Sequence, residues 1–199
     1  LPVVVERVVA EAKALQVETA QSFDQNLWRE ERTFSCQKGC ANCCHHPFLV
    51  TVLEGLLLYR WLASRGKWTT ALKKAVQDAR DKTLGSDVEI WLLSNLPCPL
   101  LRDNQCIAYE ARPLHCRVTY SDGMPSQCHP HELGAGTQLL PNLEVIVGYN
   151  SRLRGFLRKL NVVGTLMPLS EALLLGEAID SGAIPLEDSD LQHARDLVR

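Results

Sequence analysis

The sequence predicts a mainly α-helical domain in which two cysteine-rich loop regions fold together around one or two metal centres. Two observations predict this fold. Long stretches without Gly or Pro repeat their apolar residues at helical spacing, and eight cysteines gather in two short regions. The chain has 199 residues, 46% of them hydrophobic and 22% charged, so it can bury a core without covalent staples. We expect a single domain over 1–199, with its metal-binding core at about 36–130.

Helices are expected on both sides of that core. Residues 3–33 contain no Gly or Pro and predict an N-terminal helix. The most apolar stretch, 47–63, is expected to be a buried helix, since two charged residues interrupt it and it is short for a bilayer span. Within it Thr51 and Glu54 form a capping-box signature, and Gly66 is expected to end the helix. Further helices are expected over 69–84, 86–96, 142–160, 169–178 and 188–198, the last three making up a C-terminal helical segment at 142–198.

The region 97–131 differs in character, because it is rich in Cys, Pro, Asp and Asn. We expect loops with a small β-hairpin, in which PLL is joined through a turn at RDNQ to CIAY. Pro113 is expected to open a short helical turn that runs through Cys116. We find no internal repeat in the sequence.

The cysteines carry most of the functional information. Thiolates two or three residues apart converge on one centre when a tight turn folds their side chains inward, as in zinc and iron–sulfur sites. Buried apolar cysteines do not explain eight thiols in polar loops. The predicted metal ligands are Cys36, Cys40, Cys43, Cys44, Cys98, Cys106, Cys116 and Cys128.

Several kinds of cysteine site remain open at this point. Disulfides suit small secreted proteins, whereas a long chain without a visible signal segment favours metal ligation in a reducing compartment, and we expect the cytoplasm. Zinc commonly takes two short cysteine turns, whereas an iron–sulfur cluster often uses a three-cysteine turn and one distant cysteine followed by proline, which Cys98 matches. An iron–sulfur cluster is preferred and zinc is the alternative. Adjacent Cys43 and Cys44 are expected to point in different directions, so that they serve different centres or one of them has a second role.

Other polar residues near the cysteines are expected to support the centre. Arg112 and Arg117 would compensate the negative charge of metal-bound thiolates. Tyr109 would donate a hydrogen bond to a sulfur or act as an acid, and the alternative is that it packs the hairpin. The histidines beside the cysteines are expected around the ligands or on the surface rather than on the metal. They are His45, His46, His115, His129 and His131.

The whole set of motifs resembles a known family. CQKGCANCC, then CPLLRDNQCIAYEARPLHCR, then Cys128 are similar to the YkgJ-like or CxxCxxCC cysteine-cluster family, described as zinc- or iron-chelating. The resemblance covers about 36–130 and departs from the pattern in the three-residue gap between Cys36 and Cys40, where the family usually has two. The residues that match the second motif are Cys98, Pro99, Leu101, Cys106, Tyr109, Arg112, Pro113, Cys116 and Arg117.

The resemblance implies a metal or iron–sulfur cofactor. Some relatives are similar to flagellin lysine N-methylases, which carry this cluster in a longer chain; here we find no Gly-rich nucleotide loop. A radical S-adenosylmethionine enzyme shares the spacing of Cys36, Cys40 and Cys43, but it usually has an aromatic residue where Asn42 stands and needs repeated strand–helix units.

Composition excludes some partners. A net charge of −2 and few aromatic residues argue against nucleic acid, and no membrane span is expected. Three hypotheses follow: an iron–sulfur or iron protein with redox or modifying activity, a zinc-stabilised module that binds a protein partner through its outer helices, and a lysine N-methylase-like enzyme. Sequence assigns no catalytic residue and no oligomeric state.

Overall fold

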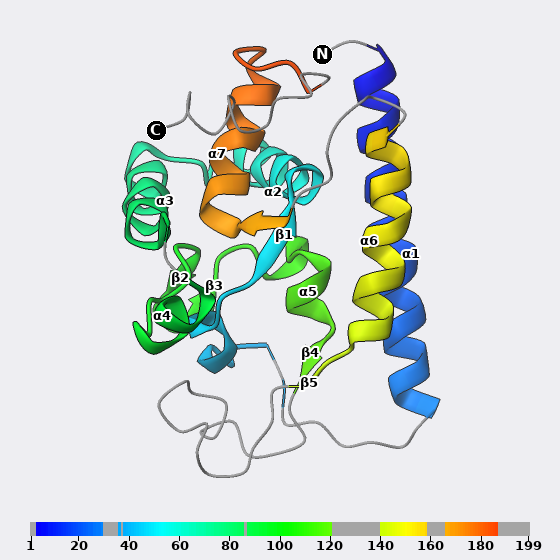
Figure 1. Cartoon of the computed structure of the whole chain (residues 1–199), viewed down its shortest axis with the longest axis horizontal. Coiled ribbons are helices and arrows are strands. Elements are labelled where there is room, and N and C mark those ends of the chain that lie inside the picture. The colour runs from blue at the N-terminus through cyan, green and yellow to red at the C-terminus, as the bar shows by residue number, and fades with distance from the viewer. Residues whose placement is uncertain are drawn as a thin grey trace.

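The computed structural model describes residues 3–29, 36, 38–85, 87–120, 140–158 and 166–186. Within these, α-helices dominate and three short two-stranded antiparallel ladders join them (Figure 1). The helices are α1 (Val3–Arg29), α2 (Val52–Ser64), α3 (Thr70–Thr83), α4 (Val88–Leu93), α5 (Leu114–Arg117), α6 (Leu143–Arg158) and α7 (Leu169–Asp180), with 3-10 turns η1 (Asn42–His45) and η2 (Tyr109–Ala111). The strands are β1 (Leu49–Thr51), β2 (Leu101–Arg102), β3 (Gln105–Cys106), β4 (Thr119–Tyr120), β5 (Leu140–Pro141) and β6 (Leu166–Pro168).

Helix α2 confirms the capping box. Its N-cap Thr51 accepts a hydrogen bond from the Glu54 backbone N–H, and the Glu54 carboxylate accepts one from the Thr51 N–H at 3.1 Å. Gly66 follows the helix end with φ 63°, the left-handed conformation that stops a helix most easily at Gly. The expectation of helix throughout 47–63 is wrong at its start, because Leu49–Thr51 is strand β1. Short apolar runs suit buried strands and helices equally well.

Strand β1 pairs antiparallel with β6, and each strand leads directly into a helix. Val50 lies opposite Met167 at the centre of the pair. The helices that follow, α2 and α7, pack so closely that a Cβ on Gly55 would lie 2.2 Å from the Ala172 carbonyl oxygen. Only a residue without a Cβ fits there.

These two strand–helix units are related to each other, which the sequence reading missed. The sequence of 49–59 aligns with that of 166–176, a shift of 117 in residue number. In this alignment the identical residues are Leu49/Leu166, Glu54/Glu171, Leu56/Leu173, Leu57/Leu174 and Leu58/Leu175. The same shift relates Val50 to Met167 and Gly55 to Ala172, the residues that face each other in the structure. The units therefore pack about a local two-fold axis.

Helices α1 and α6 lie side by side along one edge of the molecule, while α2, α3 and α7 form the other group (Figure 1). Arg60 on α2 links α1 to α7, because it forms ion pairs with Glu6 and Asp180, both at 2.7 Å. The cysteine-bearing elements lie below β1, beside α5. Of the described helices, none combines the length and the apolar character that a membrane span requires.

A hairpin and a short helical turn lie in the expected region, but the strands are Leu101–Arg102 and Gln105–Cys106 rather than PLL and CIAY, since most of CIAY forms turns. Strands β2 and β3 pair through Asp103 and Asn104, whose φ angles of 50° and 56° are those of a tight two-residue hairpin turn. Helix α5 begins directly after Pro113. The expected helix over 188–198, residues 30–33 of the first helix and Ser86 lie outside the described residues.

Candidate metal centre

One cleft collects the thiols of both cysteine regions. The first region contributes η1 and the residues before it, and the second contributes the hairpin, the turn before it and α5. A 2.7 Å hydrogen bond from the Cys98 N–H to the Cys44 carbonyl joins the two regions directly. The thiol-bearing residues that line the cleft are Cys40, Cys43, Cys44, Cys98, Cys106 and Cys116.

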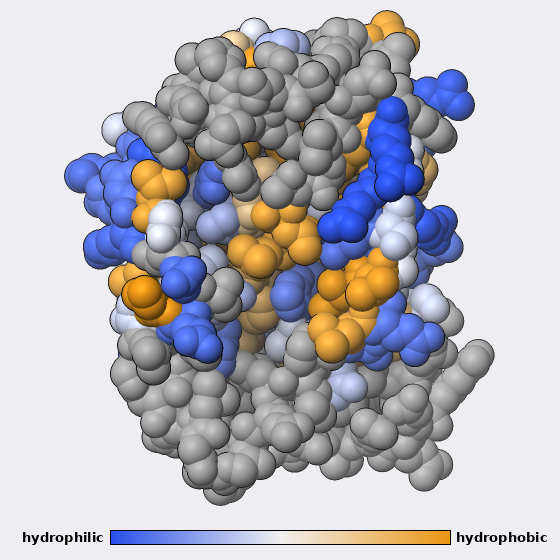
Figure 2. All heavy atoms as spheres, viewed as in Figure 1, coloured by the Kyte–Doolittle hydropathy of each residue, from blue (hydrophilic) through white to orange (hydrophobic). Residues whose placement is uncertain are grey.

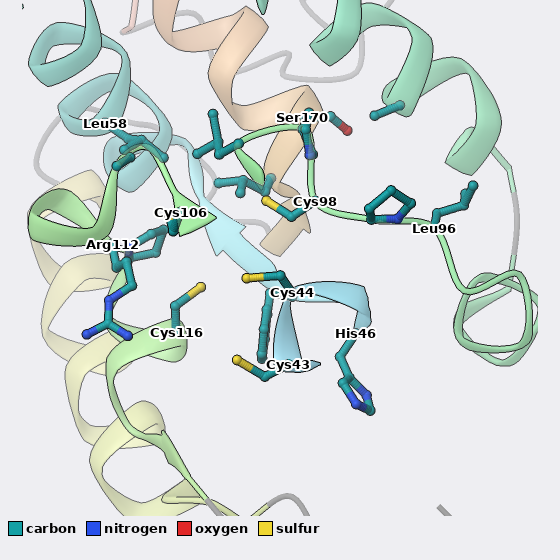
Figure 3. A pocket seen from close by; sticks show the side chains of 18 of the residues that line it. Cys43, Cys44, His46, Leu58, Leu96, Cys98, Cys106, Arg112, Cys116 and Ser170 are labelled. Carbon is teal, nitrogen blue, oxygen red and sulfur yellow. The ribbon is translucent and has the colours of Figure 1, made fainter. Parts of the chain in front are cut away.

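The sulfurs of four labelled residues point toward a common space (Figure 3). They are Cys43, Cys44, Cys98 and Cys116, and the described cysteines form no disulfide. The adjacent pair Cys43 and Cys44 therefore serves one cleft, and the expectation that they diverge is wrong. The 3-10 turn η1 runs along the cleft, so consecutive side chains both border it.

The electrostatics of these thiols show how close they are to one another. Burial raises the pKa of Cys98 to about 12. A hydrogen bond with Cys44, followed by burial, raises the pKa of Cys43, and burial together with Cys98 and Cys43 raises that of Cys116. All three are therefore neutral thiols at pH 7 without a metal, and thiolate formation needs a bound cation.

Arg112 supplies positive charge at the thiol end of the cleft. It lines the cleft and lowers the pKa of Cys43, Cys106 and Cys116, against the effect of burial. Its guanidinium lies 3.7 Å from the centre of the Tyr109 ring, and its Nε donates to the Tyr109 carbonyl at 3.0 Å. The pair is thus held in place against the thiols.

Arg117 interacts electrostatically with Cys116, and it also binds the backbone of the neighbouring turn. Its guanidinium donates to the backbone carbonyls of Arg112, at 3.0 Å from Nε, and of Glu110. Gln16 on α1 also donates to the Arg112 carbonyl at 3.3 Å. These contacts fix the turn that carries Arg112 and leads into α5.

Glu54 is a site residue whose role the sequence reading missed. Besides its capping box, its Oε1 accepts the backbone N–H of Leu114 at 3.0 Å, two residues before Cys116. The side chain is 4% exposed, and burial raises its pKa. The buried Tyr149 hydroxyl lies close to this carboxylate, and burial and the nearby Glu54 raise its pKa as well. The capping box was visible in the sequence, but a contact 60 residues away was not.

The structure describes three histidines near the thiols, and His46 lines the cleft. His46 points away from the sulfurs in Figure 3, and His45 Nδ1 lies 3.3 Å from the Asn95 carbonyl. His115 packs edge-on against Phe48, and burial lowers its pKa. Cys36 is exposed and does not line the cleft, while Cys128, His129 and His131 lie outside the described residues.

The thiols line a cleft and do not converge on one point. Among the residues that the structure describes, no three Cys, His, Asp or Glu side chains already stand close enough together to hold one metal ion. The donor set is nonetheless that of a thiolate metal site, with six sulfurs and a nearby cation.

Comparison with known proteins agrees with this donor set. A family model, CxxCxxCC, described as "Putative zinc- or iron-chelating domain", matches residues 35–132. No curated protein and no solved structure matches the chain. The matched residues include both cysteine regions and every thiol that lines the cleft.

Proposed function

We propose that this chain, whose residues 35–132 match the CxxCxxCC family of zinc- or iron-chelating domains, holds an iron–sulfur cluster in the thiol cleft and uses it in redox or modifying chemistry. The arrangement of the thiols carries this proposal. Six of them line one cleft, yet no three of the described donors are gathered for a single ion. A cluster brings its own sulfides and extends over several atoms, so it reaches thiolates that one zinc ion would have to draw together.

The charge around the cleft supports the same group. A cluster with four thiolates is negatively charged, and Arg112 is held beside Tyr109 where it favours ionised thiols. Four of the six cleft thiols suffice as ligands. We propose that they come from both cysteine regions, with Cys43 and Cys44 from the first and Cys98, Cys106 and Cys116 from the second as the candidates. When bound, the cluster would supply one-electron chemistry or Lewis acidity.

The test is metal and sulfide analysis of the anaerobically purified protein, with its absorption spectrum. Iron and sulfide in equal amounts, with broad visible absorption, are expected. Cys98→Ser and Cys116→Ser should abolish the absorption, whereas Cys36→Ser should keep it, because Cys36 is exposed and lies outside the cleft lining. A colourless protein with zinc and no sulfide would overturn the cluster.

That zinc outcome would favour a second candidate function, a zinc-stabilised module that binds a protein through its outer helices. One observation supports it. Leu143 and Val147, one turn apart on α6, are 64% and 62% exposed, and Figure 2 shows hydrophobic side chains gathered over this part of α6. Exposed apolar side chains at helical spacing suit a protein partner.

A further inference from the structure

The cleft is larger than its thiols require. It encloses about 80 Å³, and many of its lining residues carry no metal-binding group. Helices α3, α4 and α7 and the loop after α4 build this second part. We call it the apolar compartment, and its residues are Ala79, Thr83, Trp91, Leu96, Leu169 and Ser170.

The compartment adjoins the thiols on one side only. In Figure 3, Leu96 and Ser170 lie on the opposite side of Cys98 from Cys43 and Cys116. A molecule held there would touch Cys98 or a group bound to it without displacing the other sulfurs. The compartment thus has the position of a substrate site beside a cofactor.

Ser170 indicates that a ligand belongs there. The residue is 4% exposed and lines the cleft, yet no hydrogen bond links its hydroxyl to another residue of the described structure. Thr83, by contrast, has its hydroxyl engaged with the carbonyls of Ala79 and Arg80, both at 3.1 Å. The hydroxyl opens into the cleft, so its hydrogen bond is available to a molecule that occupies the cleft.

The chemistry of the walls defines the class of ligand. None of the six compartment residues is charged, and Arg112 lies at the thiol end of the cleft. A charged ligand would lose its hydration here without gaining an ion pair. At about 10–15 Å³ for each enclosed water-sized group, the whole cleft has room for roughly five to eight non-hydrogen atoms, so the compartment, which is only part of it, suits a molecule below that upper size.

We infer that the apolar compartment binds a small uncharged molecule with an apolar body and one hydroxyl or carbonyl group, which Ser170 recognises. Its role as a substrate rests on the metal centre proposed above, whereas the binding itself does not. Nothing in the family description assigns such a site.

The experiment uses the full chain, purified anaerobically, with its metal content measured on each sample. The probe is 1-pentanol, and binding is followed by saturation-transfer NMR and by tryptophan fluorescence, since Trp91 lines the compartment. Pentanoate and pentylammonium serve as charged probes of the same length. The alcohol should bind and both ions should bind at least tenfold more weakly.

Two variants locate the binding. Ala79→Leu fills the compartment and should weaken the binding of the alcohol at least tenfold. Ala71→Leu, the same change at an exposed position of α3 outside the cleft lining, should leave it unchanged. Ser170→Ala removes one hydrogen bond and should weaken the binding of the alcohol about three- to tenfold. This variant tests the site even if Ala79→Leu does not fold.

The outcomes separate this inference from the proposed function. Metal-loaded protein that does not bind the alcohol, or that binds pentanoate as tightly, overturns the inference and leaves the metal centre standing. Binding that Ser170→Ala does not weaken overturns the assigned role of that hydroxyl. The third outcome is that protein without any metal binds the alcohol and that the variants weaken this binding as expected. That result supports the compartment and overturns the proposed function.

Discussion

Glu54 connects the two cysteine regions through one buried carboxylate. One oxygen accepts from the Leu114 N–H at the start of α5, and the other accepts from Thr51, which follows the first region. Together with the hydrogen bond between Cys98 and Cys44, it fixes α5 and Cys116 relative to the first cysteine loop. We therefore expect Glu54 to matter for metal retention as well as for stability.

The substitution Glu54→Gln tests this. The amide has a single acceptor oxygen, so one buried backbone N–H loses its partner, and the free energy of unfolding should fall by about 1–3 kcal/mol. Thr51→Val is the matched control, since it removes the capping hydroxyl, costing about 1 kcal/mol, but leaves the contact to Leu114. Urea unfolding and metal analysis should show a larger loss of metal in Glu54→Gln. If Glu54→Gln and Thr51→Val lose equal amounts of metal at equal stability, Glu54 does not position the metal ligands.

The raised pKa values of the thiols make the metal-free protein sensitive to alkali. Above the ordinary thiol pKa of 9.0, the unfolded chain releases protons that folded Cys98 and Cys116 still hold. The folded state then binds more protons than the unfolded state, so stability falls as pH rises from about 9 through the pKa of about 12 for Cys98. Urea midpoints between pH 8 and 10 should fall for metal-free protein and stay flatter for loaded protein. A flat profile in both would contradict the burial of these thiols.

At the scale of the elements, the contact between α2 and α7 depends on glycine. A Cβ at position 55 would lie 2.2 Å from a backbone carbonyl oxygen, which cannot move unless α7 shifts. Gly55→Ala should therefore destabilise the protein by about 1–3 kcal/mol despite the better helix propensity of Ala.

Gly148 in the middle of α6 gives the opposite expectation for the same change. A Cβ there meets nothing within 4 Å, so Gly148→Ala should stabilise the protein by up to about 1 kcal/mol. Thermal or urea unfolding of both variants measures the two signs. Destabilisation by Gly148→Ala, or no effect of Gly55→Ala, would show that the packing of these helices differs from that described.

The helices, strands and turns also show which structural features can be predicted from the sequence. The capping box at Thr51, the turn at Asp103 and Asn104 and the helix start at Pro113 are local signals, and the structure has each of them. Strand β1 depends on a partner strand more than a hundred residues away, so no local pattern reveals it. The same holds for Ser170, which sits in an apolar helix far from any cysteine in sequence.

At the scale of the whole molecule, the metal should contribute directly to stability. The cleft draws on residues from the first cysteine loop, the hairpin, α5 and several helices, and none of these contributions exists in the unfolded chain. A cofactor present at a hundredfold excess over its dissociation constant adds about 2.7 kcal/mol, or roughly 5–11 °C in Tm for a chain of this size. Calorimetry before and after chelation measures this difference, and an unchanged Tm would mean that the metal lies outside the folded cleft.

The pairing of β1 with β6 has a consequence for synthesis in the cell. Val50 leaves the ribosome long before Met167, and until then the leucine-rich face of α2 has no α7 to cover it. Closing a loop of more than a hundred residues carries an entropic cost that earlier, local contacts do not repay. The nascent chain therefore exposes an apolar helix until α7 has been made, which is when chaperones would have access to it.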